Sequence, residues 1–256
     1  MENDGRRSLE IPVKPLYDSP QVIAATTSRG LHSDSDPYSG FSLCHYVGDR
    51  KGHWTQCRRA LARYLGISSE YLVVPRQTHS VRVALIGELP AGDDCLDGVD
   101  AVVTKLPRVA VGVNTADCLP LLLFDEHAHV IAAVHAGWRG AVGGIVDNAL
   151  DVMIQAGAHI GDIHAYIAPH IGACCFEVGD EVAARFDSDD VTRMAGRRPH
   201  VSLASSVVRS LMGFGLLADN IISSGECTRC TPGRYFSARA LGIASGRNFS
   251  FVMLKE

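Results

Sequence analysis

Apolar residues along the chain fall into short runs, and these runs alternate with amphipathic stretches and turn-forming segments. The runs are rich in valine, isoleucine and leucine, which is typical of buried strands. They predict strands over residues 81–86, 101–104, 109–113, 119–124, 130–134, 163–168 and 249–254. Each strand is short, and several are separated by stretches long enough for a helix.

Apolar residues spaced three and four apart predict helices over residues 54–65, 141–156 and 202–212. Gly66 is a typical stop after the first helix, and Ser202 is a typical N-cap for the last. Gly143 and Gly144 weaken the middle helix unless close packing requires them. The pattern therefore predicts a layered α/β domain, although it leaves the strand pairing open.

Turn formers and prolines indicate where the folded part begins. Pro12, Pro15 and Pro20 interrupt any regular element near the N-terminus, so residues 1–20 are expected to form a flexible arm. We find no internal repeat, long linker or low-complexity tract after it. Residues 21–256 are therefore expected to form a single catalytic domain.

Charge and composition narrow the function classes. The 24 Lys+Arg against 28 Asp+Glu give a net charge of −4, which argues against a general nucleic-acid binder. The apolar runs are far shorter than the roughly 20 residues of a membrane-spanning helix. The first residues carry acids and prolines where a signal peptide needs an apolar run, so a cytoplasmic location is expected by elimination. The 8 cysteines are then expected to be thiols, and ligand or catalytic duty is favoured over a disulfide framework.

Three potential metal ligands stand at the ends of the predicted strands, namely His79, Cys118 and His135. Two imidazoles and a thiolate suit zinc, and three protein ligands leave a fourth position for water, as in catalytic sites. The gaps of 39 and 17 residues match no compact zinc motif. From spacing alone, a buried thiol and two hydrogen-bonded histidines are the alternative interpretation.

Several short sequence motifs resemble those of a known protein family. In order, the chain contains QTHS, ADCLPLLL, VHAGWRGAVGGI, HIGACCFEVGDEV, Cys227-Thr228, YFSAR and Gly246-Arg247. Together they closely resemble the YfiH/DUF152 family, whose members are named multicopper polyphenol oxidases or laccase-domain proteins. The resemblance runs from about Thr26 to the C-terminus. It departs from the family's early segment at Ser28-Arg29-Gly30, which affects the expectation about substrate choice.

The resemblance implies an α+β fold of mixed β-sheets packed with helices in one domain, and one zinc held by His79, Cys118 and His135. It also implies phosphorolysis of adenosine, inosine and methylthioadenosine, and deamination of adenosine. Zinc-activated water could attack C6 of adenosine, as in other zinc deaminases. Some bacterial members edit a muramyl-serine peptidoglycan precursor, so a zinc amidase is an alternative function.

Other side chains near these motifs are candidates for substrate chemistry. Asp117 and Glu177 are the acids nearest the motifs, and Glu177 is the candidate proton-transferring acid. Arg139, Arg239 and Arg247 are candidate phosphate ligands. Capping or salt bridging is the alternative role for the acids, and a salt bridge is the alternative for Arg139. The family resemblance implies small purine nucleosides and phosphate as the partners. A metal-free hydrolase with Cys118 as nucleophile and His135 as base is a further alternative.

The remaining cysteines and histidines receive plainer interpretations. Adjacent Cys174-Cys175 make a poor disulfide, and packing or loop shaping near the site is favoured. The Cys227-x-x-Cys230 pair resembles half of a zinc ribbon without its partner pair, so ordinary loop thiols are favoured. One HxH pair, His127 and His129, is too few for a multicopper centre, which disfavours laccase chemistry. Copper could still occupy the three-ligand site in vitro.

Overall fold

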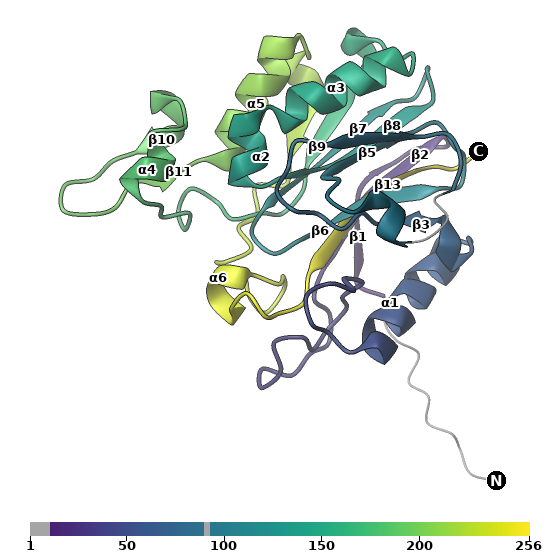
Figure 1. Ribbon diagram of the computed structural model, residues 1–256, viewed down its shortest axis with the longest axis horizontal. Helices are drawn as coiled ribbons and strands as arrows, with labels where there is room; N and C mark the ends of the chain where they lie inside the picture. The colour runs from purple at the N-terminus through teal and green to yellow at the C-terminus, as the bar shows by residue number, and fades with distance from the viewer. Residues whose placement is uncertain (1–10, 90–92) are drawn as a thin grey trace.

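Two stacked β-sheets with helices on both outer faces make up the protein (Figure 1). The computed structural model describes residues 11–89 and 93–256. One outer face carries α1 (Lys51–Tyr64). The other carries α2 (Trp138–Gly143), α3 (Ile145–Gln155) and α5 (Leu203–Phe214). The resulting order of layers is helix, sheet, sheet, helix.

Both large sheets contain parallel and antiparallel strand pairs. The first sheet has the strand order β1 (Val13–Asp18), β2 (Val22–Thr27), β13 (Asn248–Leu254), β6 (Ala110–Thr115) and β3 (Leu72–Val73). The second has the order β12 (Ile221–Ser223), β9 (His164–Ile167), β7 (Leu119–Asp125), β8 (Val130–Ala136), β5 (Ala101–Thr104) and β4 (Val83–Ile86). The expected fold class, mixed β-sheets packed with helices in one domain, is confirmed.

Smaller elements complete the fold. A two-stranded sheet pairs β10 (Val191–Thr192) with β11 (His200–Val201). Two four-residue helices, α4 (Asp180–Ala183) and α6 (Ala238–Leu241), lie in the C-terminal half of the chain. They belong to the long connections that follow β9 and β12.

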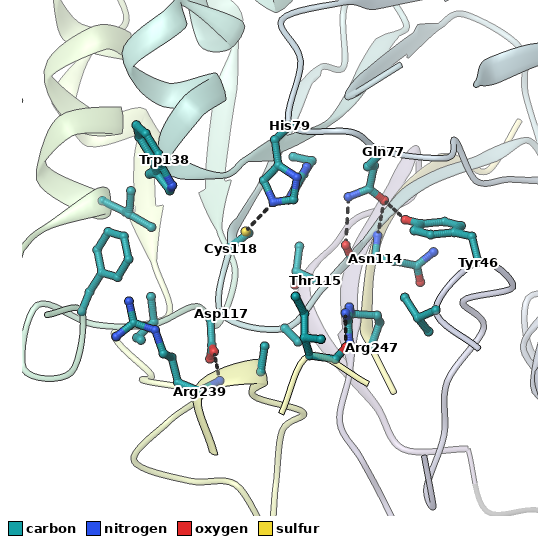
Figure 2. Close-up of a pocket in the computed structure, with 18 residues that line it drawn as sticks. Tyr46, Gln77, His79, Asn114, Thr115, Asp117, Cys118, Trp138, Arg239 and Arg247 are labelled. Carbon is teal, nitrogen blue, oxygen red and sulfur yellow. Dashed lines mark hydrogen bonds between the residues drawn. The ribbon is translucent and has the colours of Figure 1, made fainter. Parts of the chain in front are cut away.

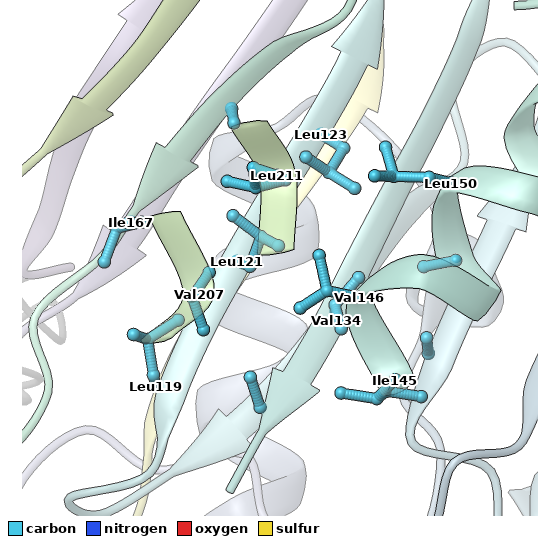
Figure 3. Close-up of a cluster of buried hydrophobic side chains, with 14 of the residues drawn as sticks. Leu119, Leu121, Leu123, Val134, Ile145, Val146, Leu150, Ile167, Val207 and Leu211 are labelled. Carbon is cyan, nitrogen blue, oxygen red and sulfur yellow. The ribbon is translucent and has the colours of Figure 1, made fainter. Parts of the chain in front are cut away.

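Apolar clusters fill both sides of the six-stranded sheet, and a third lies between the five-stranded sheet and α1. Strand β7 shows how the first two arise. Successive side chains of a strand point to opposite faces. Leu119, Leu121 and Leu123 therefore pack against α3 and α5, whereas Leu122 and Phe124 pack between the two sheets. Figure 3 shows the helix-side cluster. A strand buried on both faces reads as a continuous apolar run, which is how the sequence predicted it.

The predicted middle helix differs from the observed structure. Residues 141–156 are not one helix, because the chain breaks at Gly144, whose φ is +90°. Gly143 also packs closely, since an added Cβ would lie 2.8 Å from Val81 Cγ1. The two glycines therefore separate α2 from α3, and α2 begins at Trp138, directly after the HAG segment.

The expected N-terminal arm is also partly wrong. Residues 13–18 form the edge strand β1, which pairs with β2. Pro15 is tolerated there because β1 is an edge strand and its register shifts between Pro15 and Tyr17. Residues 1–10 of the expected arm lie outside the described residues.

Candidate active site

Three side chains, one from strand β8 and two from loops, meet where β7 begins and β8 ends. Cys118 directly precedes β7, and His135 is the penultimate residue of β8, opposite Pro120 in the antiparallel pair. His79 comes from the loop before β4. The ligand atoms of the three residues lie within 4.8 Å of one another, and Cys118 Sγ is 3.6 Å from His79 Nε2 (Figure 2). Strand pairing therefore fixes two of the three, and a loop brings the third.

The buried carboxylate of Asp100 organises both histidines. Its Oδ1 accepts hydrogen bonds from His135 Nδ1 at 2.7 Å and from the His79 backbone N–H at 3.0 Å. Its Oδ2 accepts from the N–H groups of Thr78 and Ser80. Because Nδ1 of His135 donates to the carboxylate, Nε2 is the ring nitrogen left for a metal ion, which would displace its proton.

Close packing in the centre of this site requires glycine at position 137. A Cβ there would lie 2.7 Å from His79 Cδ2 and 3.2 Å from Cys118 Sγ. His79 itself has a φ of +62°, which is uncommon for a residue other than glycine. The backbone hydrogen bonds to Asp100 hold the His79 loop in this conformation.

The electrostatics of the three groups are strongly coupled. Burial opposes ionisation of Asp100, but hydrogen bonding and the charge of His135 outweigh it and lower the pKa of Asp100 to about 2. Burial likewise opposes thiolate formation at Cys118, yet the two imidazoles lower the pKa of this thiol. The pKa of His135 is raised despite burial, because Cys118 and Asp100 both favour its charged form.

This donor set is compatible with a metal ion. Tetrahedral zinc at about 2.0–2.3 Å from nitrogen and sulfur needs ligand atoms roughly 3.4–3.8 Å apart. The distance of 3.6 Å between Cys118 and His79 fits that requirement. Asp100 supplies the carboxylate that metal-binding histidines ordinarily contact through their second nitrogen. A fourth coordination position would face the adjacent cleft.

The donor set opens onto a cleft of about 470 Å³, a size usual for small-molecule sites. Figure 2 shows its side chains converging from both sheets and from the C-terminal loops. Trp138, Phe176, Ile171 and Leu203 supply an apolar wall. The opposite side is polar, with Tyr46, Gln77, Asn114, Thr115 and Arg247 (Figure 2), and Ile243 lies there beside Arg247.

Two polar side chains in this cleft have unmet hydrogen-bonding capacity. Thr115 Oγ1 and both polar atoms of the Asn114 carboxamide are buried and make no hydrogen bond of normal geometry with any described residue. Their neighbour Gln77 is fixed, since its Oε1 accepts from the Asn114 N–H and the Tyr46 hydroxyl. Buried polar groups are normally paired, so these two side chains are exceptions in the wall of the cleft.

The three candidate arginines differ in their position relative to the cleft. Arg239 and Arg247 line the cleft, whereas Arg139 is exposed on α2 and stacks on the Trp138 ring at 4.4 Å. Arg239 Nη2 donates to the carbonyl of Glu177. Arg247 is held by the carbonyls of its own loop, including those of Ser245 and Ile243. Arg239 is thus the arginine whose guanidinium is best placed to donate to a ligand in the cleft.

The two candidate acids, Glu177 and Asp117, also differ in their position relative to the cleft. The Glu177 side chain is exposed and does not line the cleft with the three-ligand set. Asp117 does line it, next to Cys118, in a left-handed conformation with a φ of +85°. Its carboxylate accepts from the Thr228 hydroxyl and the Arg239 N–H, each at 2.7 Å.

Sequence analysis missed Asp100, Asn114 and Thr115. Asp100 stands immediately before a buried strand, and an acid at the end of an apolar run was the available signal. Asn114 and Thr115 end β6, where they read as the polar end of a strand rather than as cleft residues. His127 and His129 are exposed in the turn between β7 and β8.

Comparison with known protein families accounts for most of the chain. The family model described as multi-copper polyphenol oxidoreductase laccase matches residues 23–255. The chain belongs to this family. The resemblance to YfiH/DUF152 proteins is thereby confirmed.

Similar proteins carry purine-enzyme names. The chain is 42% identical over 247 residues to adenosine deaminase RL5 from an unknown prokaryotic organism, covering 91% of this chain and 94% of the relative. It is 35% identical to a purine nucleoside phosphorylase of Bacteroides thetaiotaomicron, covering 90% of each. Relatives of this kind support an enzyme of the purine nucleoside phosphorylase-like family.

Solved structures agree on the fold. The hypothetical protein YfiH of Bacillus licheniformis matches with a TM-score of 0.85 and 25% identity, over 95% of this chain and 99% of that one. Protein NMB0706 of Neisseria meningitidis, of family DUF152, matches with a TM-score of 0.85 and 26% identity, over 96% and 100%. Within residues 11–89 and 93–256, no helix has the length and apolar character needed to span a membrane.

Proposed function

We propose that the protein is a zinc-dependent enzyme of purine nucleosides. It would phosphorolyse adenosine, inosine and methylthioadenosine to the free base and a pentose 1-phosphate, and would deaminate adenosine. The observation that carries this proposal is a three-ligand donor set facing a cleft that also holds unpaired polar atoms and two arginines. The names of the relatives point to the same substrate class.

His79, Cys118 and His135 would hold the zinc, with Asp100 orienting both histidines. When bound there, zinc would supply Lewis-acid chemistry and lower the pKa of coordinated water. Asp100 keeps His135 in the tautomer that binds a cation. The proposal for the metal therefore rests on the chain's own hydrogen bonds as well as on its donor atoms.

The two walls of the cleft suit the two faces of a nucleoside. Trp138 and Phe176 offer apolar surface to a purine ring. The buried carboxamide of Asn114 and the hydroxyl of Thr115 would pair with the nucleoside's polar edge, which would satisfy both groups. A substrate lacking those polar atoms would leave them unpaired and bind less well.

Phosphate binding would fall mainly to Arg239. Its guanidinium lines the cleft and is steadied by the Glu177 carbonyl and the face of Phe176. Arg247 would contribute positive charge while holding its own loop. We assign proton transfer to Asp117 rather than Glu177, because of these two acids only Asp117 lies at the cleft beside Cys118.

Laccase chemistry is disfavoured by the arrangement of ligands. Among the described residues, potential metal ligands gather in two groups, one with two histidines and one with none. A multicopper oxidase needs several more histidines around a trinuclear cluster. Copper binding to the three-ligand group in vitro is compatible with this proposal, since copper competes well for nitrogen donors.

The deciding experiment is a nucleoside screen on metal-analysed protein. With phosphate, adenosine and inosine should yield free base and ribose 1-phosphate; without phosphate, adenosine should yield inosine. Full turnover by metal-free protein would instead support the Cys118/His135 hydrolase. No turnover of any purine nucleoside, with efficient cleavage of a muramyl-serine precursor, would support the zinc amidase.

A further inference from the structure

Four cysteines outside the active site meet at one place. Cys174 and Cys175 lie in the connection after β9, and Cys227 and Cys230 lie in the connection after β12. Their sulfur atoms all lie within 4.8 Å of one another. The Cys227-x-x-Cys230 pair has no second cysteine pair near it in the sequence. In the folded protein, Cys174 and Cys175 are that second pair.

The spacing of the sulfurs is that of a metal-binding set rather than of a disulfide. Cys174 Sγ lies 3.7 Å from both Cys175 Sγ and Cys230 Sγ, and Cys175 Sγ lies 3.4 Å from Cys230 Sγ. Four sulfurs at about 2.3 Å from a tetrahedral zinc are roughly 3.8 Å apart. A disulfide would need a sulfur–sulfur distance of about 2.05 Å.

The surrounding backbone is arranged to serve this cluster. The Gly172 N–H donates to Cys227 Sγ at 3.2 Å, the kind of contact that steadies a thiolate ligand. A Cβ at position 172 would lie 3.3 Å from Cys174 Sγ and 3.4 Å from Cys227 Cβ, so glycine permits the two loops to approach. Backbone hydrogen bonds join the same two loops beside the cluster, where His170 and Cys227 form an isolated parallel bridge.

We propose that Cys174, Cys175, Cys227 and Cys230 form a second, structural zinc site. Four thiolates would complete the coordination of one zinc ion, whereas the three ligands of the cleft would leave one coordination position open. Binding releases the thiol protons and leaves no position for substrate or water. The site would therefore act on structure and not on chemistry, and it stands whether or not the proposed nucleoside activity is correct.

The cluster joins two loops that border the active-site cleft. Phe176, next to Cys175, lines that cleft. Thr228, next to Cys227, donates its hydroxyl to Asp117 at 2.7 Å, and Asp117 precedes Cys118. A metal holding the two loops together would fix the apolar wall on one side and the Asp117 carboxylate on the other.

The test uses zinc content and zinc-edge X-ray absorption of the full-length protein purified under reducing conditions. Wild type should hold about two zinc ions, with an average of about 2.5 sulfurs per zinc, since one site has one sulfur and the other four. Cys118→Ala should retain about one zinc, now with four sulfurs at about 2.3 Å. The double variant Cys174→Ser/Cys230→Ser should also retain about one, with a single sulfur. Cys95→Ser, an exposed thiol outside both clusters, should keep both ions.

Zinc content and sulfur coordination of the wild-type protein decide the question even where a variant fails to fold. One zinc with one sulfur in wild type would overturn the second site. Loss of two hydrogens in the intact mass, traced to a disulfide among the four cysteines, would overturn it in favour of a redox pair. One zinc with four sulfurs in wild type would support this site and count against zinc in the cleft.

Discussion

Asp100 and His135 form a buried pair in which Nδ1–H of the imidazole donates to the carboxylate at 2.7 Å. The same carboxylate accepts three backbone N–H groups from the loop that carries His79. One acid thus sets the orientation of a histidine on β8 and the path of the loop that brings in the second histidine.

Asp100→Asn is therefore expected to weaken metal binding without removing a ligand. The amide keeps one acceptor but loses the charge, so zinc affinity should fall about 10–100-fold. The free energy of unfolding should fall by about 3–5 kcal/mol, as when one partner of a buried ion pair is removed. Competition with a chromogenic chelator and chemical denaturation measure the two effects. Unchanged zinc affinity would contradict the orienting role.

Cys118→Ala and His79→Ala should each abolish metal binding at the cleft together with both nucleoside reactions. Each removes one of three ligands, so little affinity remains. Metal analysis and a coupled phosphorolysis assay provide the measurement, and Cys95→Ser is the matched cysteine control. Retained activity in a Cys118→Ala variant would exclude both the zinc interpretation and the cysteine-hydrolase alternative.

Arg239→Gln should separate the two reactions. Loss of a cationic donor in the cleft should raise the KM for phosphate about tenfold or more. Deamination, which uses no phosphate, should change far less. Arg139→Gln is the control, since Arg139 is exposed and stacks on Trp138 outside the cleft lining. A larger phosphate defect in the Arg139 variant would reverse the assignment.

Gly137→Ala should disturb the ligands directly. The added methyl group would overlap His79 Cδ2 and crowd Cys118 Sγ, so both must move. Overpacking of this kind costs about 1–3 kcal/mol, and zinc affinity should fall with it. Gly161→Ala is a fair comparison, because a Cβ at that position would have nothing within 4 Å of it. Equal behaviour of the two variants would show that the site tolerates the shift.

Stability should depend on pH through His53. Hydrogen bonding to Cys57 and to Asp49, at 2.7 Å from Nδ1, outweighs burial and raises the pKa of His53 to about 9. A raised pKa means that the stabilisation is complete below about pH 6.5 and is lost as pH rises through about 9. His53→Gln should therefore lower the Tm more at pH 6 than at pH 10. Because the side chain is partly open to solvent screening, the difference should be about 1–2 kcal/mol in free energy.

Local pattern predicted the central strands well, because runs such as 101–104 and 119–124 are buried on both faces and read as continuous apolar segments. The local pattern could not predict the strand order, because β13 at the C-terminal end pairs with β2 and β6, which are far from it in the sequence. The same separation hid the four-cysteine cluster, whose two pairs lie on different loops. Arg139 was a candidate cleft residue because it follows the HAGW segment in the sequence. In the structure it lies one helical position beyond Trp138, where its side chain points toward solvent and does not line the cleft.

The placement of His79, Cys118 and His135 on three separate segments of the chain has a consequence for how the protein matures. In an unfolded chain these ligands are 39 and 17 residues apart and cannot hold a cation tightly. Only after β7 and β8 pair in their native register, Pro120 opposite His135, do Cys118 and His135 come together. Metal capture at the proposed site would thus follow pairing of β7 with β8 and docking of the His79 loop. The bound cation would then stabilise the finished fold by mass action instead of nucleating it.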